Sequence, residues 1–191
     1  VIFDGPDNIA VNLVELTDDD PSSKVGQMKI YTQKNGRTPT GLTPVVTSAH
    51  TTRDIDLAVK FHRKVLQNEL LIDEVLSSEE QNEFLQLPRN AKTAVKFMQG
   101  NHMFGKIALS QPLNYECHDM VPDGIAPNIG YISQAFKVND LGFSEKAISD
   151  LSCEIYNQRR LVDFPGLGQI EIITVRAPGS GALQLIFQSK G

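Results

Sequence analysis

A strand-then-helix pattern that occurs twice, well apart in the chain, is the feature that most constrains the fold. The first copy covers Thr47–Leu66 and the second covers Ser133–Ala147. Each copy has a short strand-like run that leads to an Asp, Asp54 in the first and Asp140 in the second. An Asp at this point predicts a helix N-cap, because its carboxylate accepts hydrogen bonds from the free N–H groups of the first turn. Internal repetition of this kind predicts two similar modules.

The elements around these two phrases follow one order. After Asp54, apolar residues recur at helical spacing and predict a helix to about residue 66. The alternation of apolar and polar residues predicts strands over 44–51, 70–75, 93–98 and 106–110, with a further short helix over 77–87. The second set comprises strands over 131–138, 155–163, 169–176 and 182–188, with a helix over 140–151. The expected fold is α+β, with βαβββ modules over 43–113 and 129–189 and a connector over 114–128.

Such a module covers one face of its sheet with its own helix and leaves the other face open. Two paired modules would form a curved mixed sheet around a cleft, and a small ligand would bind there. Residues 9–16 read as a further strand, and residues 17–42 are rich in Asp, Ser, Gly, Pro and Thr. We expect 17–42 to be a linker, with at most a short strand over 28–31.

Composition excludes several classes of partner. The formal net charge of −5 and the pI near 5.3 argue against nucleic-acid binding, which needs clustered Lys and Arg. No apolar run reaches the length of a membrane-spanning helix, so no membrane partner is expected. Two cysteines, Cys117 and Cys153, are too few for a disulfide framework or a zinc site. We interpret them as free thiols in a reducing compartment and expect a cytoplasmic protein.

At Asp54–Leu66 the sequence resembles the vicinal-oxygen-chelate superfamily, whose members include glyoxalase I, extradiol dioxygenases and the fosfomycin- and bleomycin-resistance proteins. The family phrase is Asp-Leu-x-x-Ala-x-x-Phe-Tyr-x-x-Val-Leu-Gly, and here His62 stands at the Tyr and Gln67 at the Gly. Ser133–Leu141 is similar to the phrase that opens the second module of the family, and Ala177–Leu185 is similar to its closing phrase. The resemblance covers most of residues 43–189 and implies a glyoxalase-like fold.

The N-terminal segment Asp4–Leu16 also resembles the closing phrase. On that resemblance we interpret residues 1–16 as a remnant strand of a lost upstream module. The alternative is an N-terminal strand unrelated to the motif.

The resemblance also implies which positions hold a metal in related enzymes, two His and two Glu. One position lies seven residues before each capping Asp, and the other lies on the last strand of each module. The corresponding residues here are Thr47, Ala108, Ser133 and Gln184. Two hydroxyls, a methyl group and a neutral amide offer neither the charge nor the donors that a divalent ion needs. We therefore expect no metal and no other cofactor.

His50 is the residue that could restore a metal site. It lies three residues after Thr47, so strand alternation places it on the opposite face, toward the helix. A β-bulge would be needed to turn it into the cleft. The alternative is a His that packs under the helix.

The remaining cavity-lining candidates share the alternation of these four positions. They are Ala49, Lys106, Ser110, Tyr131, Ala135, Lys137 and Ile186, together with Val45 and Ala182 at the strand ends. Small, mostly neutral residues leave room for a ligand but specify none, and a sheet packed only for stability would look the same.

Three functional classes remain open. The first is a module that binds a small organic molecule without metal, like the bleomycin-resistance proteins. The second is a metal-dependent lyase, isomerase or dioxygenase of the same superfamily, in which the ion would polarise a carbonyl. The third is a non-catalytic half of a four-module protein. The sequence favours the first, names no catalytic residue, and is compatible with a homodimer.

Overall fold

The computed structural model describes residues 1–5, 9–35 and 38–190. Residues 6–8, which belong to the N-terminal phrase discussed above, and residues 36–37 of the expected linker lie outside the described residues. The first part of the chain forms β1 (Ile2–Asp4), β2 (Ala10–Asn12) and α1 (Lys24–Lys34). The middle forms β3 (Thr47–Thr51), α2 (Ile55–Val65), β4 (Glu69–Leu76), α3 (Glu79–Phe84), β5 (Thr93–Gln99) and β6 (Lys106–Pro112). The last part forms a 3₁₀ turn (Val121–Asp123), β7 (Ser133–Lys137), α4 (Leu141–Asp150), β8 (Glu154–Phe164), β9 (Gly168–Arg176) and β10 (Leu183–Ser189).

Two four-stranded mixed sheets hold the fold together. The first has the order β3-β6-β5-β4 and the second has the order β7-β10-β9-β8. In each sheet the strand before the helix pairs in parallel with the last strand of the same group, and the other pairs are antiparallel. The predicted α+β class and the order of elements in the two groups are therefore confirmed.

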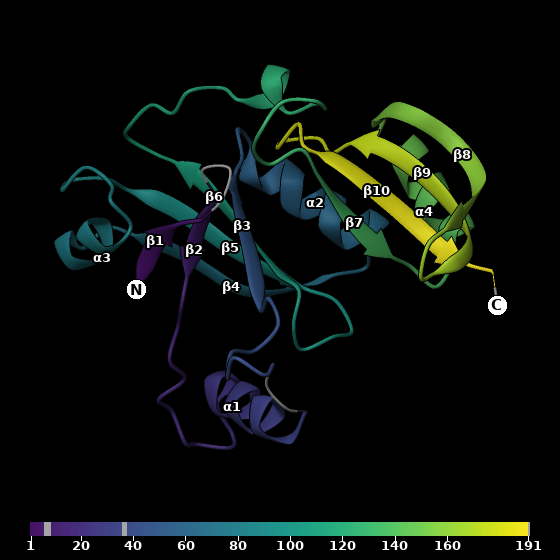
Figure 1. Ribbon diagram of the computed structural model, residues 1–191. Coiled ribbons are helices and arrows are strands. Elements are labelled where there is room, and N and C mark those ends of the chain that lie inside the picture. Colours follow the sequence, from purple (N-terminus) through teal and green to yellow (C-terminus); the bar gives the residue numbers. More distant parts are fainter. Residues whose placement is uncertain (6–8, 36–37, 191) are drawn as a thin grey trace.

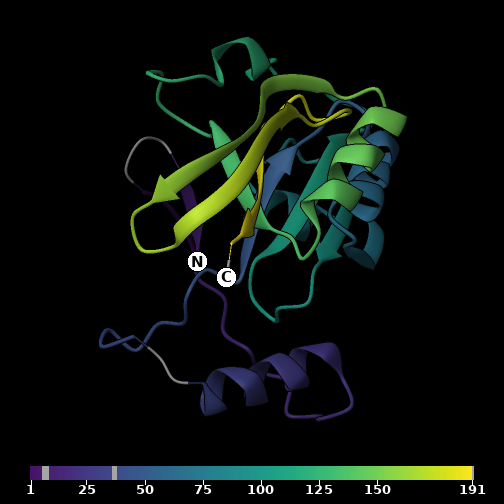
Figure 2. The same cartoon turned by 90° about the vertical axis from the view of Figure 1, so that its right-hand side faces the viewer.

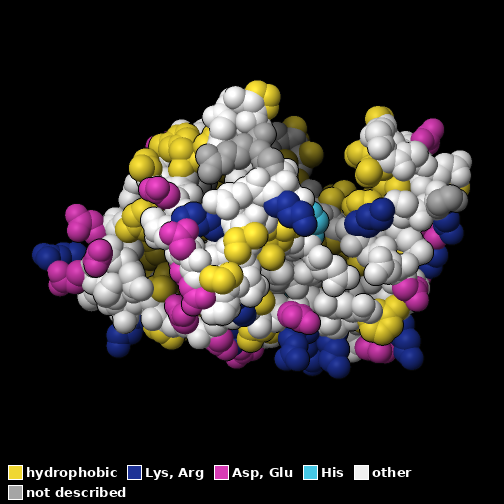
Figure 3. Space-filling view, turned by 90° about the horizontal axis from the view of Figure 1, so that it is seen from below, with side chains coloured by type: hydrophobic (Ala, Val, Ile, Leu, Met, Phe, Trp, Pro, Cys, Tyr) yellow, Lys and Arg dark blue, Asp and Glu magenta, His cyan; other side chains and the backbone are white. Residues whose placement is uncertain are grey.

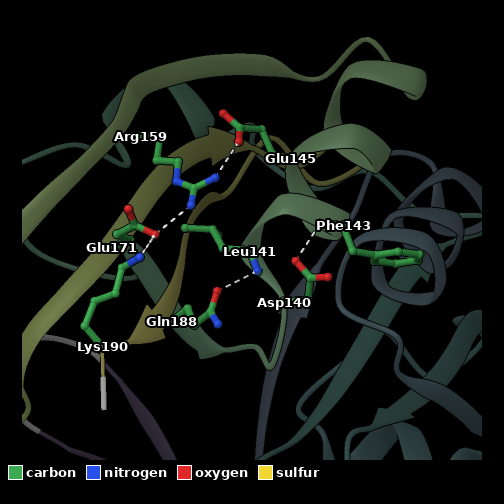
Figure 4. A network of polar contacts seen from close by, with 8 residues as sticks. All are labelled: Asp140, Leu141, Phe143, Glu145, Arg159, Glu171, Gln188 and Lys190. Atoms are coloured by element: carbon green, nitrogen blue, oxygen red, sulfur yellow. Dashed lines mark hydrogen bonds and ion pairs between the residues drawn. The ribbon is translucent and has the colours of Figure 1, made fainter.

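The two main helices begin in the same way. The carboxylate of Asp54 accepts a hydrogen bond from Leu57 N at 2.9 Å, and that of Asp140 accepts one from Phe143 N at 3.0 Å. A glutamine accepts from the first N–H of each helix: Gln111 Oε1 from Ile55 N at 2.8 Å, and Gln188 Oε1 from Leu141 N at 3.0 Å. Figure 4 shows the second of these arrangements. The internal repeat thus extends to individual hydrogen bonds.

Both helices cover the same side of the sheets. Figures 1 and 2 show α2 and α4 next to each other on one side and the β1–β2 hairpin on the opposite side. Phe61 and Val65 of α2 share a core with Leu141 and Ile148 of α4. Ile173 and Val175 of β9 and Ile186 of β10 belong to the same core. A second cluster joins α2 to β5 and β6. The face away from the helices is open, and Figure 3 shows the molecule hollowed between the β8–β9 part of the second sheet and the rest of the chain.

The region expected to be a linker contains the helix α1, so the short strand expected over 28–31 is wrong. Ser23 caps α1 by accepting a hydrogen bond from Gly26 N at 2.9 Å. Tyr31 packs edge-on against Phe104, with ring centroids 5.1 Å apart, and so holds α1 against the β5–β6 loop. The strand expected over 9–16 is shorter, since only Ala10–Asn12 is extended, and it pairs with β1 rather than with either large sheet.

None of the helices among the described residues is both long and apolar enough to cross a membrane.

Candidate functional site

A cleft of about 600 Å³ lies where the ends of the two sheets meet. Its walls come from the C-terminal ends of β3 and β6, the connector that precedes β7, and the turn between β9 and β10. The residues that line it are Ala49, His50, Thr51, Thr52, Arg53, Gln111, Pro112, Cys117, His118, Asp119, Met120, Val121, Gly124, Tyr131, Ile132, Ser180, Gly181 and Ala182. Of the residues expected in a cavity, Ala49, Tyr131 and Ala182 are brought together here.

Two stacked rings form part of the wall. The rings of His50 and Tyr131 lie 5.2 Å apart, centroid to centroid, at an interplanar angle of 25°. Burial lowers the pKa of His50 to about 4, so its imidazole is neutral at neutral pH. Burial also raises the pKa of the Tyr131 hydroxyl, which remains protonated. The wall therefore offers ring faces and neutral hydrogen-bonding groups.

His50 lies on the helix-covered face of β3, as alternation indicates. The parallel register pairs Ser48 with Ile107 and His50 with Leu109 without interruption, so no bulge turns the side chain around. Both imidazole nitrogens are buried and have no hydrogen-bond partner among the described residues. The ring reaches the cleft because β3 is the edge strand next to Tyr131.

Two charged side chains, Arg53 and Asp119, stand at the rim, among the described residues that line the cleft. Arg53 forms an ion pair with Asp119, and each is exposed. The other lining residues, within the part of the chain that the structure describes, include no Lys, Arg, Asp or Glu. Cys117 and His118 are exposed on the same rim. Within the part of the chain that the structure describes, no three His, Cys, Asp or Glu side chains come together as metal ligands.

Three of the four family metal positions lie on the open face of the sheets. Thr47 and Ala49 pair with Lys106 and Ala108, on the face opposite the Ile107 and Leu109 side chains that contact α2. Ser133 lies on the corresponding face of β7 and is exposed. Their oxygens are neutral hydroxyls, and Ala108 is a buried methyl group.

The structure differs from the prediction at Gln184. The register of β7 and β10 pairs Ser133 with Leu183 and Ala135 with Leu185, which makes Leu185 the counterpart of Ala108. The two glutamines that accept from the first N–H of each helix support this equivalence. Gln188 lies three residues after Leu185, and Gln111 lies three residues after Ala108. The prediction of Gln184 assumed the turn length of the closing phrase of the family, and the turn before β10 is one residue longer here. Leu185 has no donor atom, so the correction makes this position still less suited to a metal.

Gln184 and Ile186 lie on the helix-covered face instead. Each is fully buried, and Ile186 belongs to the core cluster with Ile173 and Phe61. They therefore do not face the open side of the sheet, and the prediction that both line the cavity is wrong.

The other expected lining residues lie on the open face but outside the cleft. Lys106 is buried, burial lowers its pKa, and its ammonium donates a hydrogen bond to the carbonyl of Met103. Ser110 donates weakly to the carbonyl of His50 at 3.4 Å. Ala135 and Lys137 are exposed.

A buried polar cluster beside the cleft was not anticipated. Gln134 Nε2 donates to Ser48 Oγ at 2.5 Å, across the seam between β7 and β3, which are not paired strands. His62, at the position of the Tyr in the family phrase, is 1% exposed and packs edge-on against Phe136. Burial, followed by the proximity of His50, lowers the pKa of His62 to about 3. Alternation predicts that Ser48 of β3 and Gln134 of β7 both lie on the helix-covered side. Only the structure shows that these two strands lie next to each other.

Comparison with solved structures identifies the fold. A glyoxalase family protein from Bacillus cereus superimposes with a TM-score of 0.68 over 82% of this chain and 100% of its own, at 15% sequence identity. The fold is glyoxalase-like. A glyoxalase I variant from Zea mays matches with a TM-score of 0.53 at 14% identity, over 77% of this chain and 46% of its own. A protein from the mobile metagenome of V. Pseudocholerae matches with a TM-score of 0.50 at 19% identity, over 78% of this chain and 97% of its own.

No family model matches the sequence, and no curated protein is significantly similar to it. The comparisons thus show a glyoxalase-like fold.

Proposed function

We propose that this glyoxalase-like protein binds a small organic molecule, without a metal ion, in the cleft at the junction of its two sheets. The observation that carries the proposal is the stacked His50–Tyr131 pair in the wall of a cleft of about 600 Å³. That volume lies within the range of small-molecule sites, which are lined mainly by apolar and aromatic groups with a few polar ones. The flat ring faces favour a planar ligand, because offset stacking adds to the area that the ligand buries.

The charge of the cleft favours a neutral ligand. Arg53 and Asp119 neutralise each other at the rim, and the imidazole of His50 is uncharged at neutral pH. An ionised ligand would lose its hydration on entry without gaining an opposite charge, which is unfavourable.

The donor set supports a function without metal. Thr47, Ser133 and Ala108 supply two hydroxyls and a methyl group, and Leu185 adds a second hydrocarbon side chain. A catalytic divalent ion needs imidazole nitrogens or carboxylate oxygens, which also offset the cost of removing its water shell. A metal-dependent lyase or dioxygenase would therefore need ligands other than those of the family positions.

A matched pair of variants, in which an alanine is replaced by tryptophan, tests where the ligand binds. Ala49 and Ala135 are exposed alanines of the edge strands β3 and β7, but only Ala49 lines the cleft. We expect Ala49→Trp to abolish the thermal shift that an aromatic ligand gives to the wild-type protein, because the indole fills the mouth of the cleft. Ala135→Trp should leave that shift unchanged. Equal effects of the two variants would place the ligand elsewhere on the open face.

A screen of neutral and anionic aromatic compounds by thermal shift also separates this proposal from a purely structural role. A non-catalytic structural half has no reason to bind any of them. Each compound would be tested at concentrations up to about 10 mM. If none of them raises the melting temperature, the purely structural role is favoured.

A further inference from the structure

Five buried polar atoms beside the cleft have no hydrogen-bond partner among the described residues. They are Nδ1 and Nε2 of His50, Oε1 of Gln134, and both amide atoms of Gln184. Gln184 is 0% exposed. Buried polar groups in folded proteins are almost always paired with protein or water, so these five atoms are free to form hydrogen bonds with a molecule that reaches them.

These atoms lie together at the seam between the two sheets. Gln134 and Gln184 are neighbours on the paired strands β7 and β10 and share the helix-covered face. Gln134 contacts Ser48 of β3, and His50 lies two residues farther along the same face of that strand. We call Ser48, His50, Gln134 and Gln184 the seam cluster.

The seam cluster adjoins the cleft through Tyr131. Tyr131 stacks on His50 and lines the cleft. Burial raises the pKa of the Tyr131 hydroxyl, and the nearby side-chain amide of Gln184 lowers it in part. The geometry between the two groups falls short of a hydrogen bond. Tyr131 is 39% exposed and precedes β7, so its side chain can move without breaking a strand. Displacement of the ring would open a path from the cleft to Gln184.

We propose that the seam cluster is the specificity subsite of the cleft and binds the neutral amide-like edge of a planar ligand, such as a carboxamide or a lactam. This inference rests on the proposed function. A primary amide has donors and an acceptor side by side, and Gln184 presents the complementary pair. The neutral imidazole of His50 adds one donor and one acceptor. The cluster contains no charged group that would compensate a buried carboxylate or ammonium.

Benzamide, benzoate and toluene are suitable probes because they share a ring and differ in the attached group. We would titrate each into ¹⁵N-labelled protein and follow the backbone and side-chain amide signals by NMR. We expect benzamide to bind at least about 10-fold more tightly than benzoate and to shift the side-chain amide signals of Gln184 and Gln134.

Gln184→Met removes the amide and keeps a side chain of similar length. It should weaken benzamide binding about 10-fold and leave toluene binding unchanged. Gln158→Met, at an exposed position of β8, is the matched control and should change neither. The preference of the wild-type protein for benzamide needs no variant and tests the inference even if Gln184→Met does not fold.

The outcomes separate the two proposals. If the three probes shift the signals of cleft residues with similar affinities, the cleft binds aromatic molecules but the seam cluster holds only water, and this inference is overturned. If no probe shifts the signals of residues that line the cleft, the proposed function itself fails.

Discussion

The turn between β9 and β10 is held against α2 at Gly179, and a methyl group there should be costly. The backbone of Gly179 has φ of 81°, and its carbonyl accepts hydrogen bonds from Arg53 N at 2.8 Å and Asp54 N at 3.1 Å. A Cβ at this position would lie 2.3 Å from the carbonyl oxygen of Asp54 and 2.7 Å from Ala58 N. Both neighbours are backbone atoms, so the turn must move away from the helix.

The expected loss has two parts. A left-handed backbone costs an alanine about 1–2 kcal/mol, and a smaller loss of entropy in the unfolded chain offsets part of this. Displacement of the turn weakens two hydrogen bonds of about 1 kcal/mol each. Gly179→Ala should therefore lower the free energy of unfolding by about 3 kcal/mol, which for a chain of this size is about 6–12 °C in melting temperature.

Gly166→Ala is the matched control. Gly166 has φ of 82°, but a Cβ there would meet no atom within 4 Å. This variant should lose only about 1 kcal/mol, the cost of the left-handed backbone. Urea denaturation of both variants measures the difference, which we expect to be about 2 kcal/mol. A Gly179→Ala variant no less stable than Gly166→Ala would refute the close contact between this turn and α2.

Three further predictions concern the buried histidines, Gln184 and the cysteines. In the folded protein His50 stays neutral down to about pH 4 and His62 down to about pH 3, whereas in the unfolded chain both bind protons near pH 6.5. The free energy of unfolding should therefore fall as the pH drops from 6.5 to 4. His62→Leu should reduce that slope by about 1.4 kcal/mol per pH unit in denaturation curves, and an unchanged slope would contradict the burial of His62. Gln184→Leu should raise the free energy of unfolding of the ligand-free protein by about 1 kcal/mol, because it removes two unpaired polar atoms, whereas a loss of stability would show that the amide is paired. Iodoacetamide should label the exposed Cys117 well before Cys153, because burial raises the thiol pKa of Cys153 to about 11. Peptide mass spectrometry measures the two labelling rates, and equal rates would contradict this prediction.

The sequence predicts the repeated elements because strong local signals mark them. Asp54 and Asp140 cap helices whose apolar residues face one way, and alternation marks the strands on either side. α1 has no such signal: it includes Gly26, carries no apolar stripe, and depends on the Ser23 cap and on Tyr31 packing against Phe104. A helix of this kind is stabilised by tertiary contacts, which the sequence does not display.

The site was harder to predict for a geometric reason. A difference of one residue in the turn before β10 reverses the face of Gln184 and Ile186, because side chains alternate along a strand. The cleft itself is built largely from the connector before β7 and from this turn, neither of which has a periodic pattern. Ala49 lies on β3 and Tyr131 lies two residues before β7, so the strand pattern predicts both, whereas Cys117 and Val121 have no such signal.

The most direct test of the central claim is a pair of thermal-shift titrations with one aromatic ligand that binds the protein. The first uses protein purified without chelator and analysed for metal by inductively coupled plasma mass spectrometry, and the second uses the same protein after dialysis against EDTA. We expect less than about 0.1 metal ion per chain and the same shift in both titrations, since the residues at the family metal positions supply no anionic or imidazole ligand. A stoichiometric transition metal, together with a shift that disappears after EDTA and returns when that metal is added, would contradict the account.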